Sequence, residues 1–374
     1  MASIRTIAFY LPQFHPIPEN DEWWGKGFTE WTNVAKAKPL FKDHYQPKLP
    51  AELGFYDLRV PEVREQQAEL ARQYGVEGFC YWHYWFGNGK RILERPFNEV
   101  LESGKPDFPF CLAWANETWT GIWHGLTNEI LIEQTYPGRE DYIDHFNNLL
   151  KAFKDKRYMR VDDKPIFVVY RPNAIPDIKL FVETFQQQAI ENGLKGVYLI
   201  ATNVPVDWDA EAKGFSAITP SNHDKLAYVR SESTIRNFYR KQLNRKKVSK
   251  VFKKIFKQPT HVYEYKEAMK WFVRDEDVKS IIYPMVIPNW DNTARSGVNG
   301  FVLHNSTPDL FKQVMQKAIN KIKDLPADKR IVFIKSWNEW AEGNYIEPDR
   351  KYGRKYLEVI KELIDSNNSQ CLEQ

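Results

Sequence analysis

The chain has 374 residues, enough for one elaborated α/β barrel or for two smaller domains. Hydrophobic residues make up 43% and charged residues 27%, which excludes wholesale disorder, and three cysteines are too few for a disulfide framework. Aromatic residues reach 15%, and rings with polar edges suit a wet surface that also offers flat apolar faces.

The net charge of +4 is unevenly distributed. Residues 240–257 contain nine Lys or Arg and no acid, so the remainder of the chain is net acidic. This distribution argues against a uniformly basic nucleic-acid binder. We expect the basic segment to form a solvated helical face, with weak peripheral membrane contact as the alternative. No run of about 18 apolar residues predicts a membrane span.

Short apolar runs alternate with helical patterns along the whole chain. The helical patterns carry apolar stripes, and they cover residues 61–74, 142–153, 178–192, 310–325 and 355–365. Strands are predicted at residues 4–10, 78–84, 108–115, 165–170, 197–202, 215–218, 281–287 and 331–335.

Eight strands separated by helices predict an α/β fold, a (β/α)8 TIM barrel with extended βα loops. A doubly wound open sheet is the alternative, but YLPQFHP stands after the first strand in place of a glycine-rich phosphate loop. We expect a single domain over residues 1–374, with a basic helical insertion at about residues 224–279.

Aromatic and amide or carboxyl side chains recur where the predicted strands end. In a barrel these ends meet at the face that holds the active site. Rings beside directional hydrogen-bonding groups are complementary to a sugar, so we predict a carbohydrate site. Its candidate substrate-binding residues are Tyr10, Gln13, His15, Trp82, His83, Tyr84, Trp114, Asn116, Glu117, Trp119, Tyr170, Asn289, Trp290, Asn338 and Trp340.

The sharpest motif is SWNEWAEG at residues 336–343, which follows the last predicted strand. If the segment turns helically, Glu339 and Glu342 lie side by side. Two close carboxylates in an aromatic pocket do not both keep ordinary pKa values, because burial and mutual repulsion raise one of them. One neutral and one ionised carboxyl group is the arrangement that glycosidic bond cleavage requires.

Four motifs in order resemble the WbsX-type proteins, which are related to glycoside hydrolase family 99, the endo-α-1,2-mannosidases and mannanases. They are YLPQFHPIPENDEWWGKGFTEWTNV, YWHYWF, LAWANETW and SWNEWAEGNYIEP. The resemblance spans residues 4–363 and implies a metal-independent, retaining glycosidase from a bacterial O-antigen or capsule system. It implies that Glu339 acts as a base on the substrate 2-hydroxyl, and that Glu342 is the acid and then the base for water.

Two other functions remain open. A glycosyltransferase would need a nucleotide-sugar site, for which the chain offers only the triplet Asp207, Trp208 and Asp209. A catalytically silent carbohydrate-binding barrel is disfavoured because both glutamates are present.

We expect no cofactor, and the eight histidines show no metal-ligand spacing such as HxH or HExxH. The first residues, MASIRTIAFYLPQFHP, lack the pattern of a signal peptide, which favours a cytoplasmic location.

Overall fold

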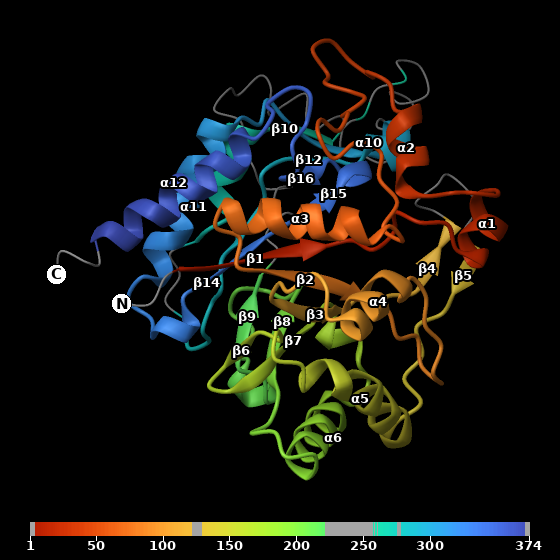
Figure 1. The fold of residues 1–374 in the computed structure, drawn as a ribbon, viewed down its shortest axis with the longest axis vertical. Coiled ribbons are helices and arrows are strands. Elements are labelled where there is room, and N and C mark those ends of the chain that lie inside the picture. Colours follow the sequence, from red (N-terminus) through yellow and green to blue (C-terminus); the bar gives the residue numbers. More distant parts are fainter. Residues whose placement is uncertain are drawn as a thin grey trace.

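Eight parallel strands form a nearly closed barrel at the centre of the molecule (Figure 1). This computed structural model describes residues 4–121, 129–220, 257, 259, 261–274 and 278–370. Strands neighbour one another in the order β11-β14-β1-β2-β3-β7-β8-β9, and a parallel bridge between Ile218 and Ile282 closes the ring. The strands are β1 (Arg5–Tyr10), β2 (Gly78–His83), β3 (Phe110–Trp114), β7 (Lys164–Val169), β8 (Tyr198–Thr202), β9 (Ala217–Thr219), β11 (Met285–Val286) and β14 (Ile331–Ile334).

The predicted (β/α)8 barrel is therefore confirmed, and the open doubly wound sheet is excluded. All eight expected strands are present, and the largest change is at residues 281–287. Only Met285 and Val286 form a strand there, because Pro284 interrupts the run and has no N–H to give to a ladder.

Helices cover the outside of the barrel where the apolar stripes predicted them. Pro61 begins the first of these helices, since its fixed φ suits the first turn, and Gly75 lies just beyond its end with a φ of 81°. The five predicted helices are α3 (Pro61–Gln73), α5 (Arg139–Phe153), α6 (Ile178–Glu191), α11 (Pro308–Ile322) and α12 (Lys355–Gln370). Additional helices are α1 (Pro18–Trp24), α2 (Glu30–Lys36), α4 (Arg95–Ser103), α9 (Tyr265–Ala268) and α10 (Thr293–Ser296).

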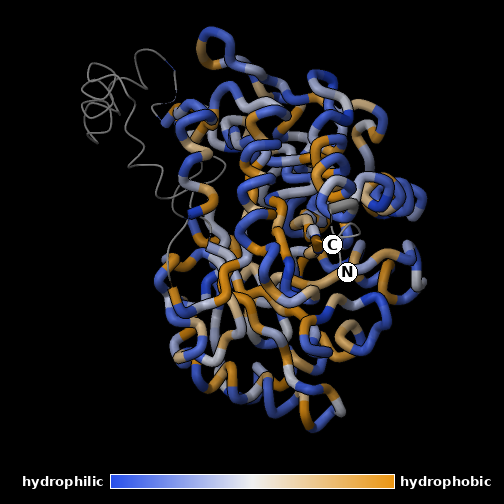
Figure 2. The backbone as a smooth tube through the Cα atoms, turned by 90° about the vertical axis from the view of Figure 1, so that its left-hand side faces the viewer, coloured by the Kyte–Doolittle hydropathy of each residue, from blue (hydrophilic) through white to orange (hydrophobic). Residues whose placement is uncertain are grey.

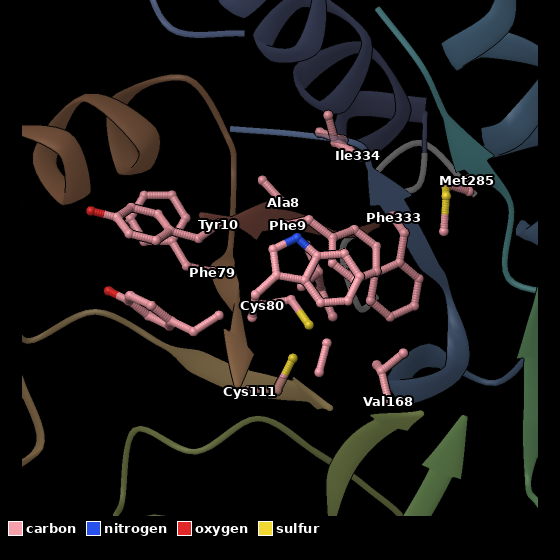
Figure 3. Close-up of a cluster of buried hydrophobic side chains, with 14 of the residues drawn as sticks. Ala8, Phe9, Tyr10, Phe79, Cys80, Cys111, Val168, Met285, Phe333 and Ile334 are labelled. Atoms are coloured by element: carbon pink, nitrogen blue, oxygen red, sulfur yellow. The ribbon is translucent and has the colours of Figure 1, made fainter. Parts of the chain in front are cut away.

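Alternate residues of each barrel strand face the barrel interior and the surrounding helices. Figure 3 places Phe9 and Phe333 together on one side of β1, while Tyr10 and Phe79 lie together on the other. Both sides are buried, so strand positions are hydrophobic almost throughout, whereas the outer helices mix hydrophobic and hydrophilic residues (Figure 2). Burying each of these rings contributes about 2–3 kcal/mol to the free energy of unfolding.

Several small elements extend the loops, and those after β1 and β3 gather at the end toward which β1 points (Figure 1). Short sheets form from β4 (Trp119–Thr120) with β5 (Ile130–Ile132), from β10 (His261–Glu264), β13 (Phe301–His304) and β12 (Trp290–Asp291), and from β15 (Asn338–Glu339) with β16 (Asn344–Tyr345). β6 (Arg160–Val161) pairs with β7, and the 3-10 turns are η2 (Pro172–Ala174), η3 (Glu211–Lys213), η5 (Met269–Trp271), η6 (Gly297–Asn299), η7 (Ala327–Lys329) and η8 (Trp340–Glu342).

The expected helical insertion at residues 224–279 is only partly covered by the described residues. Residues 240–256 of the basic segment lie outside them. The described stretch 261–274 begins with β10, which pairs in parallel with β13, before α9 and η5 follow. None of the described helices combines the length and apolar composition needed to cross a membrane.

Candidate active site

A cavity of about 210 Å³ opens beside the carboxyl ends of the barrel strands, where a barrel places its active site. Both predicted catalytic glutamates line it. The complete lining is Leu11, Gln13, Trp24, Glu30, Trp82, Tyr84, Ala115, Glu117, Trp119, Thr120, Leu131, Tyr170, Arg171, Arg295, Lys335, Glu339 and Glu342.

A tight hairpin after β14 presents the two glutamates. Asn338 and Glu339 form β15, which pairs antiparallel with β16, and the 3-10 turn η8 connects them. A 3-10 helix has three residues per turn, so residues three apart are eclipsed. The expected side-by-side placement of Glu339 and Glu342 follows from this turn.

Hydrogen bonds tie the hairpin to the barrel. Asn338 accepts the backbone N–H of Leu11 at 2.7 Å and donates to the Leu11 carbonyl at 3.0 Å, joining the ends of β14 and β1. Ser336 Oγ accepts the backbone N–H of Glu339 at 3.0 Å and donates to the carbonyl of Asn344 at 2.6 Å. The carboxylates are therefore held on rigid elements, as a preorganised site requires.

Glu339 is the buried member of the pair, with 4% of its surface exposed. Burial, and then the charge of Glu342, raise the pKa of Glu339 to about 8, although Lys335 lowers it. Trp82 Nε1 donates to Glu339 Oε1 at 2.8 Å. Burial and the neighbouring carboxylate therefore favour the protonated form of Glu339.

Glu342 is paired with a half-buried arginine. Arg295 Nη1 donates to Glu342 Oε1 at 2.6 Å, while Arg295 Nε donates to Glu30 Oε2 at 3.1 Å. Burial raises the pKa of Glu30 despite this contact, and the surrounding carboxylates raise the pKa of Arg295. The two carboxyl groups thus lie in different surroundings, Glu339 buried beside Trp82 and Glu342 paired with Arg295.

Aromatic rings wall the cavity. Trp82 stacks on Phe9 with ring centroids 4.8 Å apart, and Tyr170 meets the edge of Trp82 at 5.6 Å. Tyr84 and Trp119 pack edge to face at 5.4 Å. Six predicted substrate-binding residues line the cavity: Gln13, Trp82, Tyr84, Glu117, Trp119 and Tyr170.

The other nine predicted substrate-binding residues do not line the cavity: Tyr10, His15, His83, Trp114, Asn116, Asn289, Trp290, Asn338 and Trp340. Three of them occupy strand positions that face the helices. Tyr10 donates to Gln67 on α3 at 2.6 Å, and the His83 ring lies 2.9 Å from His145 on α5 through their Nε2 atoms. Trp114 Nε1 donates to the backbone of the β2–α4 loop at 2.8 Å.

The remaining six hold the backbone or other side chains in place. Asn338 hydrogen-bonds to the backbone of Leu11 after β1, and Asn116 accepts the backbone N–H of Arg171 at 2.7 Å. His15 Nδ1 lies 2.9 Å from the Pro12 carbonyl. Trp340 donates to Glu347 at 2.6 Å. Asn289 lines a separate depression of about 50 Å³, which is large enough for a few waters but too small for a sugar ring, and Trp290 packs against Lys335.

Sequence reasoning missed four charged residues of the cavity: Glu30, Arg171, Arg295 and Lys335. Glu30 belongs to the FTEW stretch, and Arg171 and Lys335 follow predicted strands, so a signal existed for these three. Arg295 had none, because α10 is a single turn within a long loop.

Two residues of the triplet that suggested a nucleotide-sugar site make structural hydrogen bonds. Asp209 accepts the backbone N–H of Ala212 at 3.0 Å and so caps η3, while Trp208 donates to Asn173 at 2.9 Å. Within the described ranges, no three His, Cys, Asp or Glu side chains are grouped so that they could hold a metal ion.

Fold and site together define a barrel with two neighbouring glutamates, one of them buried, at the carboxyl end of its strands. The sequence model of the family described as "Glycosyltransferase WbsX" matches residues 6–360. The chain therefore belongs to this family, which confirms the resemblance found in its motifs.

Two curated proteins are similar to the chain over most of its length. "Uncharacterized protein WxcX" of Xanthomonas campestris pv. campestris (strain B100) is 35% identical over 365 residues, which cover 96% of this chain and 49% of that protein. The WxcX protein of strain ATCC 33913 matches equally well. The chain thus spans about half the length of the curated relatives it matches.

Solved structures share the fold. The GH99 endo-alpha-mannosidase from Bacteroides thetaiotaomicron superposes with a TM-score of 0.58 at 14% identity, covering 100% of both chains. A "Glycoside hydrolase-like protein" superposes with a TM-score of 0.57 at 15% identity, covering 97% of this chain and 94% of that one.

Proposed function

We propose that the protein cleaves glycosidic bonds in a bacterial polysaccharide or oligosaccharide with retention of configuration, through Glu339 and Glu342. The observation that carries the proposal is the unequal pair. Burial favours a protonated Glu339, and Arg295 pairs with Glu342, inside an aromatic-walled cavity. Fold similarity to glycoside hydrolases, together with the WbsX family match, supports a carbohydrate substrate.

Retention is what the resemblance to the substrate-assisted glycosidases implies. The closeness of the two carboxyl groups supports it, because the charge of Glu342 helps to raise the pKa of Glu339. An inverting enzyme needs a wider gap, since a water molecule must enter between the base and the sugar. The substrate 2-hydroxyl then serves as the nucleophile. The base removes its proton, O2 attacks C1, and the leaving oxygen departs with the proton of the acid; water later opens the anhydro-sugar.

The roles of the two glutamates follow from their protonation. The resemblance implies that Glu339 is the base and Glu342 the acid. The electrostatics of the free site favour the reverse, because a carboxylate bonded to Arg295 is a poor proton donor and burial favours the protonated form of Glu339. We therefore assign Glu339 as the acid and Glu342 as the base.

The first experiment measures the release of reducing ends from a panel of bacterial polysaccharides. Glu342→Gln should lower turnover about 10²- to 10⁴-fold, the usual contribution of an acid or base, while the fold is retained. Glu358→Gln on the exposed face of α12 is the matched control and should leave turnover unchanged. Near-normal turnover by Glu342→Gln would reject the assignment. Binding without any cleavage would favour a silent carbohydrate-binding barrel.

An aryl glycoside with a good leaving group separates acid from base. Such a leaving group departs without protonation, so the acid variant keeps its activity and the base variant does not. We expect Glu339→Gln to retain turnover on this substrate and Glu342→Gln to lose it. The opposite result would restore the roles implied by the resemblance.

Glycosyl transfer is the second candidate, because the matching family is described as a glycosyltransferase. The same carboxyl pair would transfer a sugar if an acceptor hydroxyl replaced water in the second step. A nucleotide-sugar donor would require a diphosphate site, and calorimetry with nucleotide sugars and Mn²⁺ distinguishes that route.

A further inference from the structure

Lys335 is a buried cation of the cavity that the proposed reaction does not use. It directly follows β14, lines the cavity and has 7% of its surface exposed. Its ammonium lies over two aromatic rings, 5.7 Å from the centroid of Trp82 and 5.2 Å from that of Trp290. The rings favour the charged form but accept none of its N–H groups as a carboxylate would.

The Lys335 ammonium has no hydrogen bond or ion pair within the described part of the chain. The charges of Glu339, Glu342 and Arg295 and the Tyr170 hydroxyl act on it through space. Burial lowers the pKa of Lys335, but together these groups raise it and so favour its charged form. They do not accept its three N–H donors, and buried donors without acceptors are costly. Arg295, a half-buried cation of the cavity, is by contrast bonded to two carboxylates.

Arg171 is a second cation with unused donors. Its Nε pairs with Glu117 at 2.8 Å, and its guanidinium lies 5.6 Å from the centroid of the Tyr170 ring. The terminal Nη groups bond to no other described residue, and the side chain is 45% exposed. The charges of Lys335 and Arg171 both influence the pKa values of Tyr170 and Glu117. The two cations therefore lie on the same side of the cavity.

The carboxyl groups of the cavity, in contrast, are engaged. Arg171 pairs with Glu117, Arg295 binds both Glu30 and Glu342, and Trp82 donates to Glu339. Among the described charged groups of the lining, Lys335 and Arg171 are thus cations that keep N–H donors unused. A ligand that engages these donors must bring acceptors, and a negatively charged acceptor makes the strongest such hydrogen bonds.

We propose that the saccharide bound beside Glu339 carries a carboxylate, as a uronic acid does, and that this carboxylate binds Lys335 Nζ and the Nη groups of Arg171. The inference rests on the proposed carbohydrate function and names its substrate class. Hydroxyl groups of a neutral sugar accept weaker hydrogen bonds than a carboxylate and leave the ammonium charge uncompensated.

The test compares two forms of the same ligands. Oligosaccharides from uronic-acid-containing bacterial polysaccharides are titrated before and after chemical reduction of their carboxyl groups, with binding measured by calorimetry. We expect the acidic form to bind about ten- to a hundredfold more tightly, the range for charge-assisted hydrogen bonds. In Lys335→Met this preference should shrink about tenfold or more, whereas binding of the reduced form should change little.

Lys312→Met is the matched control, because it removes the same charge from an exposed position on α11. The Lys335→Met variant should unfold at the same temperature as the wild type or higher, since it replaces an unpartnered buried charge with an apolar chain of similar length. Equal binding of the two forms, no binding by any acidic form, or an unchanged preference in folded Lys335→Met would overturn the inference.

Binding and turnover separate this inference from the proposed function. A preference for the acidic form without any cleavage would support the carboxylate site and reject the hydrolytic function. Equal cleavage and equal binding of the acidic and reduced forms would support the function and overturn the carboxylate site.

Discussion

Two buried glutamates from the same segment of the chain behave differently. Glu347 accepts hydrogen bonds from Trp340 and Gln67, both at 2.6 Å, and from Tyr56 at 2.9 Å. Glu339 accepts one from Trp82 at 2.8 Å and faces a cavity. Burial raises both pKa values, that of Glu347 to about 7 and that of Glu339 to about 8.

The comparison teaches that a raised pKa alone does not mark a functional carboxyl group. Glu347 sits in a closed network in which each neighbouring donor points at it, as in a structural element. Glu339 lies beside open space, the arginine-paired Glu342 and an unpartnered Lys335. Glu339 therefore differs from Glu347 in having hydrogen-bonding groups beside a cavity that are not yet satisfied.

The largest expected effect is on the hydrogen-bond network around Glu347. Replacing Glu347 with Leu removes the acceptor of three buried donors, and unsatisfied buried groups cost about 1–3 kcal/mol each. We expect the free energy of unfolding to fall by about 3–5 kcal/mol, measured by chemical denaturation. Glu347→Gln keeps one carbonyl acceptor, so its free energy of unfolding should fall by less. A Leu variant as stable as the wild type would remove the distinction between the two glutamates.

The free energy of unfolding should depend on pH through Glu339. Between about pH 5 and pH 8, folded Glu339 holds a proton that the unfolded chain has released, so raising the pH favours unfolding. Glu339→Gln does not titrate, and its stability relative to the wild type should rise by up to about 3 kcal/mol across this range. Thermal unfolding at several pH values measures the difference. A constant difference would mean that Glu339 is ionised in the folded protein.

The smallest effect concerns the turn that carries Glu342. Gly343 has a φ of 61°, and an added Cβ would lie 2.5 Å from Lys48 Nζ and 2.8 Å from the backbone N and O of Asp291. Gly54 has a similar φ of 63° with nothing within 4 Å, so it is the matched control. Both Ala variants should lose about 1 kcal/mol from the backbone conformation, and Gly343→Ala about 1–2 kcal/mol more. Equal losses in thermal denaturation would contradict this close packing.

Much of the fold was predictable from sequence. The barrel strands are short apolar runs bounded by turn residues, and the helices carry apolar stripes, both of which are local signals. The predicted strand at residues 331–335 ends within one residue of β14, and the following motif places Glu339 and Glu342 together.

The direction of individual side chains was harder to predict. Trp82 and His83 are adjacent on β2, yet the first lines the cavity and the second contacts α5. Alternation decides this, but both faces of a parallel barrel strand are buried, so hydrophobicity does not reveal which residues point inward. Tyr10 and Trp114 also face the helices, and their hydrophobicity likewise gave no sign of this direction.

The sequence by itself determined the barrel, the position of the carboxyl pair and the family, because strand pattern, turn spacing and motif are properties of contiguous residues. The tertiary structure alone decided which glutamate favours its protonated form and which cations remain open. Arg295 reaches Glu30 and Glu342 across 265 and 47 positions of the chain, and a charge acts through distance in space rather than along the sequence.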